Sequence, residues 1–96
     1  MAGAGHEAEW TLLSNHGKVL LCIANDPAIR VTDIASMVGI KERAVQRILA
    51  ELRDYGFVSS TRQGRRNRYR VNRRQRLRWS PNGSLTVGDL VDMLDR

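Results

Sequence analysis

The chain has 96 residues, a formal net charge of +6 and a single cysteine, Cys22. This length fits one small domain, and one cysteine excludes a disulfide within the chain. No apolar run approaches the roughly 20 residues that a membrane-spanning helix needs, so we expect a cytoplasmic protein with no membrane segment.

The first predicted helix runs from Trp10 to Ala24. It follows a segment of small residues, 1–9, that we expect to be disordered. Apolar residues recur at helical spacing along it, and Asn25 and the residues after it end the helix. Its predicted core face consists of Leu12, Leu13, His16, Val19, Leu20 and Ile23.

A second, short helix is predicted from Asp33 to Val38. An extended link through Ile29 and Val31 leads to it, with Thr32 as its N-cap. Gly39 follows as the residue that ends it.

The third predicted helix, residues 41–55, is amphipathic. Its inward positions at helical spacing are Val45, Ile48, Leu49 and Leu52, which leaves a polar outer side. A short helix, a turn and a longer helix form a helix-turn-helix. The same pattern also occurs in plain three-helix bundles, so these residues alone leave both interpretations open.

Two strand-like segments, 57–62 and 68–72, flank a turn at 63–67 and predict a β-hairpin. In the second segment Tyr69 and Val71 alternate with arginines, which places the two apolar side chains inward. Nine arginines lie within the seventeen residues 62–78, and no Asp or Glu occurs from Tyr55 to Gly88. Arginine binds phosphate and guanine in a bidentate manner, so we expect double-stranded DNA as partner, with a solvated basic surface as the alternative.

An arginine-rich link, 73–85, precedes a last helix, 86–96, in which Thr86 and Asp89 form a capping box. A helix of about ten residues is marginal by itself, so its apolar stripe must dock on the first helix or on a second subunit. We expect the second arrangement and a homodimer; Trp10 and Trp79 serve as interface anchors or as core residues. The predicted dimerisation residues are Val87, Leu90, Val91 and Leu94.

Residues 52–58 and 64–71 resemble the end of the recognition helix and the wing of winged helix-turn-helix transcriptional regulators, with MarR-like proteins as the nearest relatives. The resemblance covers about residues 11–72. It implies a mainly α fold with a small β-hairpin (α+β): a winged helix-turn-helix over 10–72, with a three-helix core, a wing and a C-terminal helix.

The resemblance also implies that the third helix enters the major groove and that the wing follows the backbone or the minor groove. Phosphate contacts or exposed i,i+4 pairs are the alternative roles for the polar residues of the helix, and a solvent-facing position is the alternative for Glu42. The recognition-helix candidates are Lys41, Glu42, Arg43, Gln46 and Arg47, and the wing and backbone candidates are Thr32, Arg62, Arg65, Arg66 and Arg68.

The predicted function is that of a sequence-specific, double-stranded DNA-binding regulator of transcription, a dimeric repressor associated with the nucleoid. The alternatives are a low-specificity architectural DNA-binding protein and a winged-helix module that holds a protein or an RNA. His6, His16 and Cys22 form no nucleophile–base pair and no metal-ligand cluster. We therefore expect no catalysis, no metal and no cofactor, and no residue identifies a site for a small-molecule effector.

Overall fold

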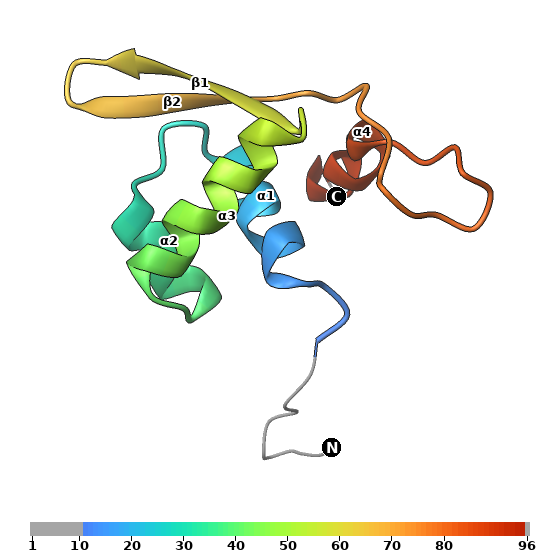
Figure 1. Cartoon of the computed structure of the whole chain (residues 1–96), viewed down its shortest axis with the longest axis horizontal. Helices are drawn as coiled ribbons and strands as arrows, with labels where there is room; N and C mark the ends of the chain where they lie inside the picture. Colours follow the sequence, from blue (N-terminus) through green and yellow to red (C-terminus); the bar gives the residue numbers. More distant parts are fainter. Residues whose placement is uncertain (1–10, 96) are drawn as a thin grey trace.

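The structure is a computed structural model that describes residues 11–95. Its helices and hairpin confirm the predicted winged helix-turn-helix fold. In Figure 1 the hairpin lies across one end of the three helices, and the C-terminal helical segment lies beside them. No helix among these residues is long and apolar enough to cross a membrane. The elements are α1 (Asn15–Asn25), α2 (Val31–Val38), α3 (Glu42–Asp54), β1 (Val58–Gln63), β2 (Arg66–Val71), α4 (Val87–Val91) and the 3-10 helix η1 (Asp92–Asp95).

One hydrophobic core joins these elements. The inner faces of the three helices supply most of it, and the hairpin and α4 each add to it. The buried core residues are Val19, Leu20, Cys22, Ile23, Ile29, Ile34, Ala35, Val45, Ile48, Leu49, Leu52, Val58, Tyr69 and Val87.

Helix α1 begins later than predicted. Ser14 is its N-cap, and the Ser14 hydroxyl accepts a hydrogen bond from the Gly17 amide at 3.2 Å. Because the chain enters the helix at this cap, Leu12 and Leu13 precede the helix and are exposed, so their predicted core positions are wrong. The predictions for residues 1–9, including His6, and for Trp10 lie outside the described residues.

Helix α2 begins earlier than predicted, at Val31, so Val31 is not part of an extended link. Arg30 is the N-cap residue, and it makes no side-chain capping bond. Thr32 lies inside the first turn and is therefore not the N-cap; its hydroxyl donates to Glu42 Oε2 at 3.3 Å. Gly39 ends the helix as predicted, with a φ of 84° that glycine adopts without steric cost.

Helix α3 differs from the prediction by one residue at each end, since Lys41 and Tyr55 are its cap residues. The four predicted inward side chains are buried, at most 6% exposed. Of the side chains predicted to face outward, Glu42, Arg43, Gln46 and Arg47 are exposed, whereas Ala50 is half-buried. The helical periodicity of the sequence therefore predicted the orientation of α3 correctly.

The hairpin has a shorter turn than predicted, because β1 lies one residue later in the chain and β2 begins two residues earlier. Val58 pairs with Val71 and the register continues to Gln63 opposite Arg66, which leaves a two-residue turn. Gln63 and Arg66 are the last paired residues, so the turn consists of Gly64 and Arg65 instead of the predicted residues 63–67. Tyr69 is buried as predicted, whereas Phe57 precedes β1 and is half-buried against the core.

The segment between the hairpin and α4 folds back on itself. Backbone hydrogen bonds run from the Leu77 amide to the Leu85 carbonyl, and from the Gly88 amide to the Arg73 carbonyl, both at 2.9 Å. A Cβ at Gly88 would lie only 3.1 Å from the Arg73 carbonyl oxygen, so a larger residue there would push against this backbone contact. The beginning of α4 is thereby fixed to the end of the wing.

The C-terminal helix is shorter than predicted, because α4 gives way to the 3-10 helix η1 after Val91. The predicted capping box is present, with the Asp89 amide donating to the Thr86 hydroxyl at 3.3 Å and the Thr86 amide donating to Asp89 Oδ2 at 2.9 Å. Val87 is fully buried in the core of its own chain, so it is a core residue rather than an interface residue. Leu90 and Val91 are half-buried against the same core, and Leu94 is exposed.

Replacing Thr86 with alanine is expected to lower the free energy of unfolding by about 0.5–2 kcal/mol, the usual effect of losing an N-cap. Urea denaturation followed by circular dichroism measures this loss. Ser36→Ala, at an exposed position within α2, is the control and is expected to leave stability unchanged or slightly raised. Equal stabilities of the two variants would show that the cap does not stabilise the docked α4.

Candidate nucleic-acid interface

Helix α3 presents an exposed polar face opposite its buried one. Arg43, Gln46 and Arg47 are spaced three and four residues apart and therefore share one side of the helix. The three side chains are exposed. Their guanidinium and amide groups are the groups that read guanine and adenine edges in a major groove.

At the start of α3, the side chains of Lys41 and Glu42 differ in their contacts. Lys41, the N-cap residue, is exposed and makes no side-chain capping bond. Glu42 accepts the hydroxyl hydrogen bond of Thr32 at 3.3 Å, which joins the first turns of α3 and α2. Thr32 and Glu42 thus hold each other at the surface where the two helices meet, a contact that the sequence did not predict.

Glu51 is a residue of this face that the sequence analysis missed. Its Oε1 lies 2.6 Å from His16 Nε2, across the α1–α3 contact, and 3.5 Å from Arg47 Nη1. The hydrogen bond with His16 lowers the pKa of Glu51 below its usual value; burial opposes this shift, and the positive charge of Arg47 adds a smaller lowering effect. The i,i+4 spacing from Arg47 was the signal that would have found Glu51.

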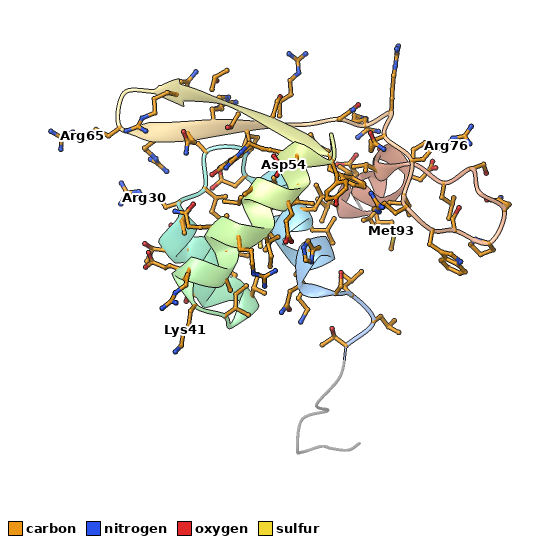
Figure 2. The ribbon with its side chains drawn as sticks, viewed as in Figure 1. Arg30, Lys41, Asp54, Arg65, Arg76 and Met93 are labelled. Atoms are coloured by element: carbon orange, nitrogen blue, oxygen red, sulfur yellow. The ribbon has the colours of Figure 1, made fainter. Side chains whose placement is uncertain are left out.

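The wing carries its arginines in two distinct situations. Arg66 donates from Nη2 to the Ala28 carbonyl at 2.6 Å, and Arg62 donates from Nε to the Gly64 carbonyl at 3.1 Å. Arg65 and Arg68 are exposed, and Figure 2 shows Arg65 extending away from the tip of the hairpin. The wing therefore combines two arginines that stabilise its own fold with others that face solvent.

A cavity of about 300 Å³ lies between the wing and the beginning of α2. Arg65 and Arg66 line it from the hairpin, and Arg30 lines it from the residue before α2. Figure 2 shows Arg30 and Arg65 on the same side of the molecule. Arg30 was not among the predicted residues, although its place at a helix start, where anions bind favourably, was a usable signal.

The arginines that follow the wing are used differently. Arg73 donates from Nη2 to Asp92 Oδ1 at 2.6 Å, and this contact raises the pKa of the Arg73 guanidinium further above its usual value. Arg76 donates to the Gly83 carbonyl at 3.2 Å, and Arg78 lies over the Tyr55 ring at 4.6 Å. These three side chains contact their own chain, so the arginine run is not one continuous surface.

Cys22 is the single cysteine of the chain, and we expected it to be neither catalytic nor a metal ligand. Cys22 is buried, and burial raises the pKa of its thiol above the usual value, as expected for an unreactive core cysteine. Within residues 11–95, no group of three or more His, Cys, Asp and Glu side chains is placed to hold a metal ion.

The sequence matches a family model described as the Crp-like helix-turn-helix domain over residues 12–79. The match covers the three helices and the wing and ends before α4. No curated protein matches the chain. The matched family is the Crp-like one, whereas the sequence motifs resembled MarR-like regulators. The winged helix-turn-helix is common to both families.

Solved structures share this fold. ZitR of Lactococcus lactis, a zinc-responsive MarR family member, has a TM-score of 0.53, and ZitR in complex with DNA has a TM-score of 0.55. In both, the identity is 21%, over 72% of this chain and 49% of ZitR, so this chain spans about half the length of ZitR. IscR of T. potens has a TM-score of 0.56 at 15% identity, over 90% of this chain and 89% of IscR.

Removing the Arg66 side chain is expected to loosen the wing without unfolding the protein. The lost hydrogen bond to Ala28 normally contributes about 0.5–1.5 kcal/mol. The Tyr69 amide, which donates to the Pro27 carbonyl beside this bond, should therefore exchange its hydrogen roughly two to ten times faster in Arg66→Ala. NMR-detected hydrogen exchange measures this, with Arg65→Ala as the matched control. Identical exchange in the two variants would contradict the proposed role of Arg66.

Proposed function

We propose that this chain, which belongs to the family of Crp-like helix-turn-helix domains, is a sequence-specific regulator of transcription that binds double-stranded DNA as a dimer. The observation that carries this proposal is the common orientation of its free cationic groups. In Figure 2 Lys41, Arg30 and Arg65 extend from the same side of the molecule, from the start of α3, the start of α2 and the tip of the wing. A duplex lying along this side would meet all three elements.

In this proposal α3 enters the major groove. Arg47 and Gln46 contact base edges, since arginine pairs with guanine and glutamine with adenine, each contact contributing about 1–3 kcal/mol of discrimination. Arg43 shares their face of the helix and joins them in base or phosphate contacts. Lys41 and Glu42 lie at the leading end, where Lys41 binds a phosphate.

The wing and the start of α2 bind the DNA backbone. Arg65 and Arg68 are exposed and reach phosphates or a narrow minor groove, whose negative potential attracts arginine. Arg62 adds its charge beside them, and Arg66 positions the hairpin through Ala28. The first turn of α2, with Thr32, offers backbone amides to a phosphate.

We propose a homodimer that acts as a repressor on the nucleoid of the cytoplasm. Two recognition helices related by a two-fold axis would read half-sites about one helical turn apart. A dimer bound over a promoter would keep RNA polymerase off the DNA, and this needs no additional surface for recruiting polymerase. The resemblance to MarR-like regulators supports association through the terminal segments, where Leu90, Val91 and Leu94 lie, and the ZitR structure with DNA supports the partner.

The first test is selection of bound duplexes from a random pool, repeated with two variants. Arg47→Ala and Gln46→Ala are expected to lower affinity for the selected site by roughly five- to 150-fold and to leave binding to unrelated DNA nearly unchanged. Arg76→Ala is the charge-matched control, because Arg76 contacts its own chain at the opposite end (Figure 2). An architectural protein would give the reverse result: no selected motif, and greater loss from Arg76→Ala than from Arg47→Ala.

The wing makes a separate prediction. Replacing Arg65 with alanine should weaken binding to all duplexes about equally and reduce the slope of log affinity against log salt by about 1. Binding titrations between 50 and 200 mM salt, the range over which about six to ten phosphate contacts change affinity by orders of magnitude, measure the slope. An unchanged slope would remove Arg65 from the phosphate contacts while leaving the role of α3 intact.

A further inference from the structure

The end of the molecule away from the proposed DNA side is rich in exposed apolar side chains. Eight large hydrophobic residues are exposed within residues 11–95, and seven of them belong to the segment before α1, the end of α3 and the C-terminal region. Patches of this kind mark interaction sites. The seven are Leu12, Leu13, Tyr55, Trp79, Leu85, Met93 and Leu94, and the eighth is Met37 in α2.

A half-open apolar pocket of about 280 Å³ lies among these segments. Its polar lining groups already have partners, since His16 is paired with Glu51 and Arg78 lies over the Tyr55 ring. The free surface of the pocket is therefore apolar, and an uncharged hydrophobic group fits it. The apolar lining residues are Gly17, Leu20, Leu52, Phe57, Leu77 and Leu90.

A hydrophobic group of this kind lies on the same end of the chain. Trp79 directly follows Arg78, a lining residue of the pocket, and the residue is 77% exposed. It begins the loop that leads to Leu85, which projects from the body of the molecule in Figure 1. An indole that remains in water forgoes one of the largest apolar contributions that a single side chain can make.

We infer that Trp79 of each copy inserts into this apolar pocket of a second copy. The pocket and the tryptophan lie on one end of the same chain, so a two-fold axis lets each copy fill the pocket of the other, as an isologous interface requires. A second copy supplies both halves of this contact, because the same chain carries the exposed indole and the pocket. This inference rests on the dimer of the proposed function and specifies the residues through which the two copies contact each other.

This end carries exposed charges of both signs. Arg78 belongs to the same region as the exposed carboxylate Asp95, so a two-fold arrangement can set a cationic group of one copy against an anionic group of the other. Charges of both signs at the rim favour a specific orientation over unspecific apolar association. The free cationic groups Arg30, Lys41 and Arg65 lie on another side (Figure 2) and remain accessible in such a dimer.

The test is sedimentation equilibrium of the full chain without DNA. The wild-type protein is expected to be a dimer, and Trp79→Ala is expected to weaken self-association at least about tenfold, as for the anchor residue of an interface. Met37→Ala is the matched control, because Met37 is exposed on α2 and is expected to leave the dimer unchanged. In a Trp10→Phe background, the fluorescence of Trp79 should shift to shorter wavelength as the protein concentration rises.

A second variant addresses the pocket rather than the tryptophan. A Cβ at Gly17 would meet only ordinary contacts, 3.7 Å from Ser14 Oγ and 3.8 Å from Leu13. Gly17→Leu should therefore fill part of the pocket, keep the helical circular dichroism and thermal midpoint, and give a monomer. Leucine also forms helix more readily than glycine, so loss of the fold is not expected.

Two results would overturn the inference. Only the second of them would also contradict the dimer of the proposed function. A dimer that persists in both Trp79→Ala and Gly17→Leu would show that the copies associate elsewhere, and the dimeric regulator would stand. A wild-type chain that stays monomeric at every concentration would remove the dimer from both proposals. Selection of bound duplexes, measured separately, would still decide whether the chain reads DNA.

Discussion

The burial of one face of α3 is the constraint on which the proposed interface depends. Val45, Ile48, Leu49 and Leu52 are at most 6% exposed, and burying side chains of this size contributes roughly 1.5–3 kcal/mol each. Rotating α3 about its axis would expose them, so the helix has one favourable orientation. The opposite face, with Arg43, Gln46 and Arg47, is therefore held outward by the packing of the core.

The wing takes its position from fewer and more local interactions. A two-stranded hairpin is marginally stable by itself, and here the buried Tyr69 side chain and two hydrogen bonds to the loop between α1 and α2 hold it. The Tyr69 amide donates to the Pro27 carbonyl at 2.8 Å, and Arg66 donates to the Ala28 carbonyl. Tyr69 lies in the middle of β2 and Arg66 next to the turn, so the hairpin is held along its length, whereas the Arg65 side chain is exposed to solvent.

The sequence predicted the fold and the inner and outer faces of α3 because both follow from the spacing of apolar residues along a helix. It misplaced Thr32, Leu12 and Val87, since helix starts and docking partners depend on hydrogen bonds and contacts that spacing does not encode. Tertiary hydrogen bonds were missed for the same reason, as between His16 and Glu51, 35 residues apart. The predicted DNA-contacting residues are exposed where expected, and their contacts to DNA remain proposals.

The arginine run shows why charge composition alone overstates an interface. Nine arginines occur in residues 62–78, yet Arg73 pairs with Asp92 and Arg78 lies over Tyr55. The acids of α4 and η1 further offset the positive charge at that end, while no acid lies in the wing. The hairpin therefore carries arginines with no acid among its own residues. Because such asymmetry steers a protein toward an anionic partner, a duplex would approach the wing first, and α3 would then meet the groove.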